Sequence, residues 1–299
     1  MSNLQRAEQI VRRHIVARGV RPEDANEAMM VTQLSRDERD ELALAYWPGD
    51  TVHTLTSSNS NLYWICGPRG RRGFATIGEV ASFMGHDRRG VPPAARRAGH
   101  GEYKVNAWSA ASVHFRMAAH CAQMATEAFP DHERWSVGSL FSGPFDALAE
   151  GFVSCGAKTV RAFAAENDDE KAEVLHTVSG CYVYGSAEQA ANECPQVDAL
   201  VASPPCDEVS AAGNGGDCDD TRTHVETICA TVRRACPLVV VIEQSDGMRT
   251  HHPELYADMR RSLHTPPYAW RHASVEAHKD YGASHFRKRL LWVGTRLES

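Results

Sequence analysis

From about residue 135 onward, short apolar runs alternate with segments whose apolar residues recur every three or four positions. The runs at 197–202 and 238–242 have the length of buried strands, whereas Leu148 and Phe152 lie four apart, on one face of a helix. The pattern predicts strands at 136–141, 159–165, 182–184, 197–202, 238–242, 268–276 and 289–294, and helices near 145–153, 169–178, 221–235 and 253–264. Strands that alternate with helices of this length predict an α/β fold with a doubly wound, mostly parallel sheet.

The chain before residue 135 has a different, mainly helical pattern. Apolar spacing predicts helices at 3–18, 35–46, 76–84 and 107–128, a β-prone stretch at 51–64, and a loop rich in glycine, proline and arginine at 85–101. We therefore expect three parts, which are a helical N-terminal segment (1–70), helices that pack on the catalytic domain (71–130) and the α/β catalytic domain itself (131–299).

Length and composition exclude several classes of protein. A chain of 299 residues suffices for one large α/β domain or two small ones. No apolar stretch approaches the roughly 18 residues of a membrane span, and the N-terminus lacks the apolar core of a signal peptide. The nine cysteines show no C-x-x-C pair, which argues against a zinc site and a disulfide framework. We therefore expect an intracellular protein without bound metal, in the cytoplasm or nucleus depending on the organism.

The net charge of −6 does not by itself indicate a nucleic-acid binder, but the charges are unevenly distributed. Arginines are concentrated in 69–104, and a second basic cluster comprises Lys279, Arg287, Lys288 and Arg289. Two basic patches on an acidic body fit a cleft that contacts phosphates. Solvated surface arginines account for such runs about equally well.

A thiol and a carboxylate each follow a predicted strand. The tetrapeptide Ser203-Pro204-Pro205-Cys206 comes directly after 197–202, and Glu243 follows 238–242. Because the carboxyl ends of parallel strands meet at one edge of an open sheet, where ligands bind, we expect both side chains to face one site. A thiolate nucleophile beside a proton-donating carboxylic acid indicates covalent catalysis on an electrophilic ring carbon.

The first predicted strand, turn and helix have the form of a nucleotide-cofactor loop. Gly143 at the strand end lets the backbone approach a ligand, beside the free N–H groups of the following helix. Glu166 ends the second strand, where many α/β folds place an acid on ribose hydroxyls. A helix-capping role would explain Glu166 equally well.

Six short motifs together resemble the cytosine-C5 DNA methyltransferases in order and spacing. They are Leu140-Phe141-Ser142-Gly143, Glu166, Pro204-Pro205-Cys206, the stretch 210–222, Glu243, and the segment 280–294 with Arg287-Lys288-Arg289. The resemblance covers roughly 135–296 and implies the Rossmann-like fold of S-adenosylmethionine-dependent methyltransferases. Residues 73–85 are similar to the family's ninth motif and 103–109 to its tenth, although both precede the first. This order resembles a circular permutation.

The resemblance also implies roles for individual residues. Cys206 would attack C6 of a cytosine flipped out of double-stranded DNA, and we expect its pKa to be lowered by arginine or a helix N-terminus. Glu243 would contact N3 and the exocyclic amine of the base and lend a proton. Arg287 would hold the base O2 and the carboxylate, with Arg289 in support. The S-adenosylmethionine site would comprise Phe141, Ser142, Gly143, Glu166, Asn167, Asp168, Pro204, Asn106 and Trp108.

The chain departs from the family pattern around the cofactor and in the recognition domain. The departures are Val105, Pro144-Phe145-Asp146, Asp207, Gln244-Ser245, His285 and the lack of an acid in 185–187. Residues 1–70 are too few for a usual recognition domain, so base readout is minimal, or comes from 85–101 or from a partner chain. Two alternatives stay open, which are a catalytically weak methyltransferase-like module that binds nucleic acid or partners, and an RNA cytosine methyltransferase of the tRNA-modifying type.

Overall fold

The computed structural model places two compact units, which are described separately below. It describes residues 5, 9–11, 13, 29–32, 44–46, 64–66, 72–74, 76–86, 91–155, 158–210, 218–263, 267–283 and 285–297. The first unit comprises Met1–Ala111 with Ala283–Phe286, and the second comprises Ser112–Gly282 with Arg287–Ser299. In the part of the chain that is described, none of the helices combines the length and the apolar character that a membrane span requires.

The first unit contains a four-stranded antiparallel sheet in the order β2-β1-β3-β4. Its strands are β1 (Met29–Thr32), β2 (Leu44–Tyr46), β3 (Trp64–Cys66) and β4 (Arg72–Phe74). The described residues 5, 9–11 and 13 are helical, as predicted, and β3 begins at the end of the β-prone stretch 51–64, whereas β1 and β2 were not predicted. The pairing joins segments distant in sequence, and the apolar spacing within one segment does not reveal such pairing.

Three helices follow this sheet, and they are α2 (Ile77–Phe83), α3 (Val91–Arg97) and α4 (Glu102–Ala111). Thr76 caps α2 in a capping box, because its hydroxyl accepts the Glu79 N–H while the Glu79 carboxylate accepts the Thr76 N–H at 2.7 Å. Helix α3 lies within the stretch 85–101 that we predicted to be a loop. Its prolines occupy the first helical turn, where a missing N–H costs no hydrogen bond.

The helix predicted over 107–128 is interrupted at His114. This residue has extended backbone angles (φ −67°, ψ 128°), and a new helix, α5 (Phe115–Ala128), begins after it. The His114 Nδ1 accepts the Arg116 N–H at 3.3 Å and so caps α5. Burial, with the nearby charges of Arg116 and Arg287, lowers the pKa of His114 to about 4, which keeps the ring neutral and able to accept.

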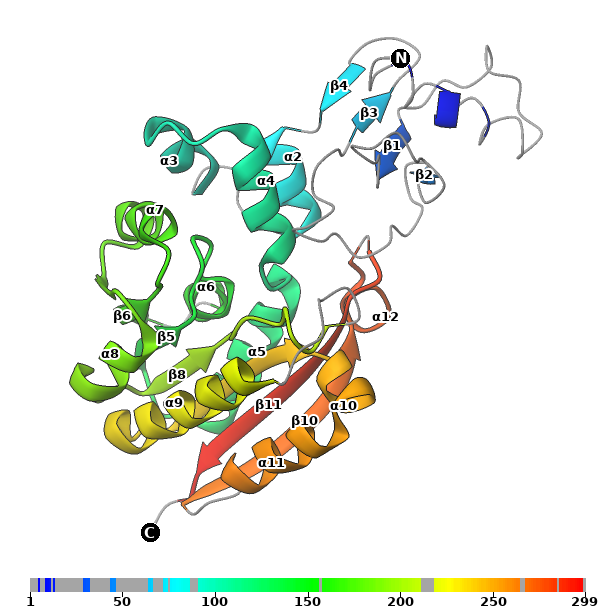
Figure 1. The fold of residues 1–299 in the computed structure, drawn as a ribbon. Helices are drawn as coiled ribbons and strands as arrows, with labels where there is room; N and C mark the ends of the chain where they lie inside the picture. Colours follow the sequence, from blue (N-terminus) through cyan, green and yellow to red (C-terminus); the bar gives the residue numbers. More distant parts are fainter. Residues whose placement is uncertain are drawn as a thin grey trace. The chain divides into compact units, whose positions relative to one another are not determined.

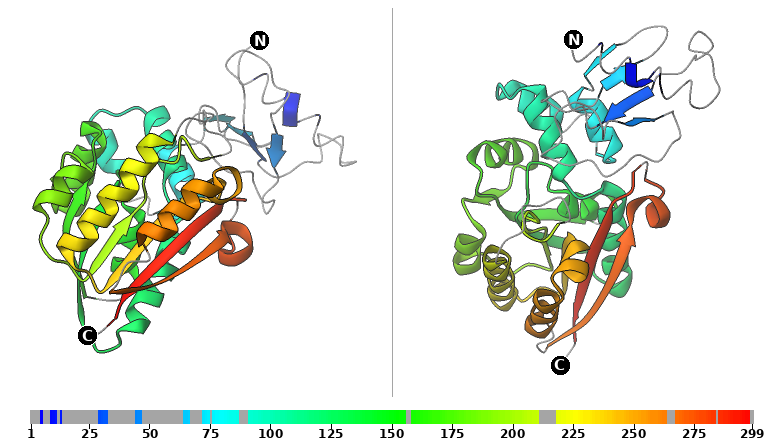
Figure 2. Two further views of the ribbon diagram at one scale, coloured as in Figure 1. Left: turned by 60° about the horizontal axis from the view of Figure 1, so that its bottom comes forward. Right: turned by 45° about the vertical axis from the view of Figure 1, so that its right-hand side comes forward.

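A seven-stranded sheet organises the second unit (Figure 1), in the order β10-β11-β9-β8-β5-β6-β7. Its strands are β5 (Arg134–Leu140), β6 (Lys158–Ala165), β7 (Tyr182–Tyr184), β8 (Ala199–Ala202), β9 (Val239–Ser245), β10 (Tyr268–Glu276) and β11 (Lys288–Arg296). Strand β11 is antiparallel to both of its neighbours, β9 and β10, and the other neighbouring pairs of the sheet are parallel. Figure 2 shows β10 and β11 (orange and red) paired at one edge of the sheet. The predicted mostly parallel, doubly wound α/β sheet is therefore confirmed.

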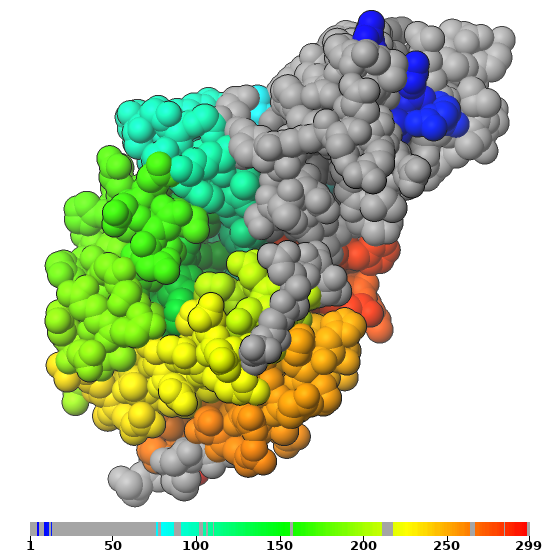
Figure 3. Space-filling view, viewed as in Figure 1, coloured from blue at the N-terminus to red at the C-terminus, as the bar shows by residue number. Residues whose placement is uncertain are grey.

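Helices cover both faces of this sheet. They are α6 (Ala147–Ser154), α7 (Asp169–Ser179), α8 (Ala187–Glu193), α9 (Asp219–Ala235), α10 (Gly247–His251), α11 (Pro253–Leu263) and α12 (Ala277–Tyr281). Helices α8, α9 and α11 pack side by side on one face, and the side chains of α9 (yellow) and α11 (orange) form the outer surface there in Figure 3. Helices α5 and α6 pack against each other on the opposite face, and α6 contacts β5, β6 and β8.

The close packing of α5 on α6 depends on a glycine. A Cβ added at Gly151 would lie 2.5 Å from the carbonyl oxygen of Ala118, a distance that real Cβ atoms do not reach.

The central strands of the sheet are enclosed on both faces, since every residue of β8 and β9 is buried. Burial on both faces explains why these strands appear in the sequence as unbroken apolar runs.

Candidate active site

The predicted thiol and carboxylate do come to the same edge of the seven-stranded sheet. Cys206 follows β8 by four residues, and Glu243 lies in β9, which runs parallel to β8. We predicted that Glu243 would lie beyond its strand, but β9 continues to Ser245. The extension arises because β9 pairs with β11 up to Ser245, whereas its pairing with β8 stops at Ile242.

Glu243 is held by an ion pair and by a hydrogen bond. Its side chain is buried, with 4% of the residue exposed. The Oε1 atom lies 2.5 Å from Nε of Arg289, and the Oε2 atom accepts a hydrogen bond from the Ser203 hydroxyl at 2.9 Å. Separation of this buried ion pair would leave both charges buried and unpaired, which is costly in free energy. The carboxylate is therefore expected to stay beside Arg289.

The structure pairs Glu243 with Arg289, and the expected contact of Arg287 with this carboxylate stays a prediction. Arg289 opposes Ser245 across the β9–β11 ladder, and residues two apart on a strand share a face, so its side chain meets Glu243. The family resemblance assigned the carboxylate contact to Arg287 and a supporting place to Arg289. Arg287 is also buried, with 3% exposed, and its charge acts on the Cys206 thiol.

The Cys206 thiol is only half-buried, but solvent exclusion still dominates its ionisation. Burial raises the pKa of Cys206 above its ordinary value; the charges of Arg289 and Arg287 oppose this, and those of Glu243 and Asp207 add to it. The sequence-based prediction of a lowered thiol pKa is therefore wrong for this arrangement. The two arginines do not outweigh the loss of solvent and the neighbouring carboxylates.

The backbone around Cys206 is fixed by polar contacts on both sides. The Gln244 amide donates to the carbonyl oxygens of Pro204 and Pro205 at 3.4 and 3.3 Å. The carbonyl of Cys206 accepts the N–H groups of Val209 and Ser210 at 3.1 and 2.8 Å, which closes a turn. Gln244, one of the departures from the family pattern, therefore still anchors the nucleophile loop to β9.

Glycine allows the next element to approach this loop. A Cβ added at Gly247, the first residue of α10, would lie 2.1 Å from the carbonyl oxygen of Val209. Farther along the chain, Arg116 of α5 donates to the carbonyls of Tyr281 and Gly282, both at 3.2 Å. These contacts fix the chain just before Arg287, and nothing in the sequence pattern singles out Arg116 for this role.

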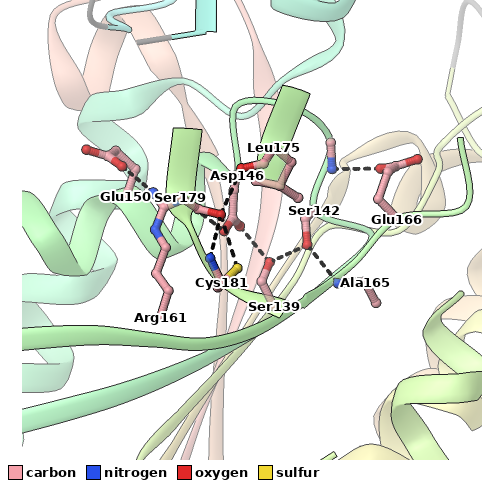
Figure 4. Close-up of polar contacts among 11 residues, drawn as sticks. Ser139, Ser142, Asp146, Glu150, Arg161, Ala165, Glu166, Leu175, Ser179 and Cys181 are labelled. Carbon is pink, nitrogen blue, oxygen red and sulfur yellow. Dashed lines mark hydrogen bonds and ion pairs between the residues drawn. The ribbon is translucent and has the colours of Figure 1, made fainter. Parts of the chain in front are cut away.

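The predicted cofactor loop lies at the ends of β5 and β6 (Figure 4). Phe141 and Gly143 both have positive φ, 54° and 59°. The Glu166 carboxylate accepts the N–H of Gly143 at 2.8 Å and that of Asp168 at 3.0 Å. Because each carboxylate oxygen can accept two hydrogen bonds, both retain capacity for ribose hydroxyls. A Cβ at Gly143 would meet nothing within 4 Å, so the backbone there adjoins open space and the residues fit a nucleoside cofactor.

Two of the predicted cofactor residues, Ser142 and Asp168, already make hydrogen bonds within the fold, and a third is exposed to solvent. The Ser142 hydroxyl donates to Ser139 at 2.9 Å and accepts the Ala165 N–H at 3.3 Å, so it ties β5 to β6. Asp168 caps α7 by accepting two N–H groups at 3.1 and 3.2 Å. Asn167 is exposed.

The remaining cofactor candidates lie apart from this loop in the chain. Pro204 is buried beside the nucleophile. Asn106 and Trp108 belong to α4 of the first unit, where the Trp108 ring packs on that of His100 at 5.2 Å between centroids. The Asn106 side chain lies outside the described residues. The place of both residues beside the cofactor stays a prediction.

A buried polar chain that the sequence analysis missed supports the cofactor loop. Ser139 donates to the Asp146 carboxylate at 2.6 Å, and that carboxylate lies 3.6 Å from Arg161, which also pairs with Glu150. Burial raises the pKa of Asp146, with Arg161 and Ser139 acting against it. We had counted Asp146 only as a departure from a glycine-rich loop, since its distance from Ser139 in sequence gives no sign of the contact.

We expect Ser139→Ala to lower the free energy of unfolding by about 1–3 kcal/mol and to weaken cofactor binding several-fold. The change removes the donor to a buried carboxylate and the acceptor of the Ser142 hydroxyl. Urea unfolding and calorimetric titration with S-adenosylmethionine measure the two effects. Ser154→Ala is the matched control, because Ser154 donates to a helix carbonyl and not to the loop. Unchanged cofactor affinity in Ser139→Ala would show that the contacts among Ser139, Ser142 and Asp146 support only the fold.

Within the described ranges, no group of three or more His, Cys, Asp or Glu side chains could hold a metal ion.

The candidate site consists of two halves on one edge of the sheet. One half holds a thiol, a buried carboxylate and two arginines. The other holds a strand-end loop with an acid beside it, in the arrangement of a nucleoside-binding site.

Known proteins resemble this chain in fold and, more specifically, in one family pattern. A comparison with curated protein sequences gives no match. Among solved structures, TrmN from Thermus thermophilus aligns at 18% identity and TM-score 0.39, over 59% of this chain and 48% of its own. A putative DNA modification methyltransferase from an E. coli prophage aligns at 18% and 0.40, over 54% and 46%. S. pombe Dnmt2 methyltransferase aligns at 13% and 0.43, over 56% and 51%.

This chain thus spans about half the length of those three proteins, and similarity at this level concerns the fold alone. The sequence match to a family is more specific. The family model of the C-5 cytosine-specific DNA methylases matches residues 135–299, which include both halves of the candidate site. The protein belongs to the C-5 cytosine-specific DNA methylase family.

Proposed function

We propose that this protein transfers a methyl group from S-adenosylmethionine to C5 of cytosine in double-stranded DNA, through a covalent bond to Cys206. Methyl transfer to cytosine follows from the family. The observation that supports the covalent route is the placement of Cys206 beside a buried carboxylate that Arg289 and Ser203 hold in position. A carboxylic acid near a nucleophile suits addition to a ring whose nitrogen must accept a proton.

The proposed reaction starts at the thiol. Because burial raises the thiol pKa, Cys206 needs a base, and its proton passes through solvent to the Glu243 carboxylate. Sγ then bonds to C6 of the flipped cytosine, and Glu243 gives this proton to N3 as the C5–C6 π electrons become available at C5. S-adenosylmethionine supplies the methyl group that C5 takes up. A base then removes the C5 proton, the C6–S bond breaks, and N3 returns its proton to Glu243.

The chain's own residues hold the reactants in this proposal. Arg289 keeps Glu243 in place, and Arg287 contacts the base O2. Glu166 would accept hydrogen bonds from the ribose hydroxyls of the cofactor, and Phe141 and the Gly143 backbone would help to hold it. The open space at Gly143 and the free acceptor capacity of Glu166 support this assignment.

The order of the motifs supports a circular permutation as part of the proposal. Helix α2, in the ninth-motif stretch, and α4, in the tenth, both precede β5 along the chain. The described strands of the first unit are short, which supports a proposal in which a partner chain or the 85–101 stretch supplies target readout.

A methyl-transfer assay tests the substrate. The full chain is incubated with radiolabelled S-adenosylmethionine and either a DNA duplex rich in cytosine contexts or an RNA of the same sequence. We expect label at C5 of cytosine in the duplex. Label in the RNA alone would establish the tRNA-type alternative, and no label in either, with the cofactor shown to bind, would establish the catalytically weak alternative.

A further inference from the structure

Ser203 links the nucleophile loop to the catalytic carboxylate. It comes directly after β8, and its N–H donates to the carbonyl of Leu140 at 3.3 Å, which continues the contact between β8 and β5. Its hydroxyl crosses to β9 and donates to Oε2 of Glu243 at 2.9 Å. The residue that begins the Pro-Pro-Cys segment thus contacts the side chain that faces the same substrate.

The contact from Ser203 complements the one from Arg289. Arg289 forms an ion pair with Oε1 at 2.5 Å, and Ser203 donates to Oε2, so the ion pair and the hydrogen bond engage opposite oxygens of one carboxylate. An ionic contact to one oxygen leaves the carboxylate free to rotate about its last bond, whereas a second donor on the other oxygen fixes the plane. A buried hydrogen bond to a charged group is strong enough for this purpose.

A second contact runs in the opposite direction between the same two segments. Gln244, the neighbour of Glu243 in β9, donates to the carbonyls of Pro204 and Pro205. Neighbouring residues of a strand point to opposite faces, so Glu243 and Gln244 engage the loop from two sides. The loop donates once through Ser203 and accepts twice from Gln244.

We propose that Ser203 is a positioning residue, whose hydroxyl fixes the Glu243 carboxylate relative to Cys206 and couples the nucleophile loop to β9. The inference rests on the proposed function for its effect on rate, but the coupling itself is a property of the free protein. Ser203 touches neither the reacting carbon nor the cofactor in this proposal. It acts through Glu243.

The experiment compares the full-length protein with Ser203→Ala and Ser203→Thr. The first reading is the rate of covalent attachment to a saturating 5-fluorocytosine duplex with S-adenosylmethionine. We expect Ser203→Ala to slow it about tenfold or more, as loss of a hydrogen bond to a charged group does. Ser203→Thr, which keeps the hydroxyl, restores the rate. Cofactor affinity by calorimetry stays unchanged in all three, and Ser154→Ala serves as the control for serine replacement.

The second reading needs no substrate. The N–H groups of Val209 and Ser210 bond to the Cys206 carbonyl, so their hydrogen exchange reports how firmly the loop is held. We expect Ser203→Ala to speed this exchange and Ser203→Thr to restore it. The proposal is overturned if Ser203→Ala changes neither exchange nor attachment rate, or if Ser203→Thr behaves as Ser203→Ala does. Faster exchange in Ser203→Ala, with no attachment by the unmodified protein, would contradict the proposed function and leave the coupling standing.

Discussion

Replacement of Cys206 by serine is expected to reduce methyl transfer by about four orders of magnitude or more, the scale seen when an enzyme loses its covalent nucleophile. A hydroxyl occupies nearly the same space, but it ionises far less readily than a thiol and adds poorly to a ring carbon. The fold is expected to persist, because Cys206 is only half-buried and its backbone turn does not depend on sulfur. Cys236→Ser, at an exposed cysteine, is the control and is expected to retain full activity.

The rate at which Cys206 is alkylated should depend strongly on pH. Burial raises the thiol pKa, so the neutral form predominates at neutral pH in the free protein. Alkylation of Cys206 by iodoacetamide should therefore be slow near pH 7 and should accelerate only as the pH rises past the ordinary thiol range. Peptide mass spectrometry distinguishes Cys206 from the other cysteines. Rapid alkylation at pH 7 would mean that Arg287 and Arg289 outweigh burial.

Glu243→Gln is expected to lower the rate of methyl transfer by about 100- to 10,000-fold, the range for loss of a positioned proton donor. Glutamine keeps the length of the side chain and can still accept from Ser203, but it cannot give a proton to N3. The change also leaves Arg289 buried without its counter-charge, which should cost about 3–5 kcal/mol of stability. Steady-state rates and urea unfolding measure the two consequences.

A paired variant separates these two effects. In Glu243→Gln with Arg289→Met both charges are removed, so we expect most of the lost stability to return while the rate stays low. Recovery of the rate together with the stability would show that Glu243 has only a structural role. A single Glu243→Gln variant that retains activity within tenfold of the original would exclude Glu243 as the proton donor.

The sheet was predictable because its strands are buried on both faces. Runs such as 197–202 and 238–242 contain little but apolar residues, and their alternation with helices fixes a parallel order. The end of β9 was not predictable, because its last residues pair with β11, which lies about forty residues further along. Strands β1 and β2 were missed for the same reason, since short antiparallel strands depend on partners outside the segment.

The sequence predicted that Cys206 and Glu243 lie at the same edge of the sheet. It did not predict the ion pair of Glu243 or the direction of the Cys206 pKa. Parallel strand ends bring the two residues to one edge whatever the details of packing. The ion pair of Arg289 with Glu243 at 2.5 Å depends on the register of β11 against β9, which the motif does not encode. The direction of the thiol pKa depends on how much solvent the surrounding elements exclude, a property of tertiary packing.

Covalent capture of a fluorinated duplex tests the central claim most directly. Fluorine at C5 cannot leave as a proton does, so an enzyme that adds Cys206 to C6 and methylates C5 remains attached to the DNA. With S-adenosylmethionine present, we predict an adduct whose mass equals protein plus methylated oligonucleotide, and whose attachment site is Cys206. The account is contradicted if the protein binds cofactor and duplex but forms no adduct, or if the adduct persists in Cys206→Ser.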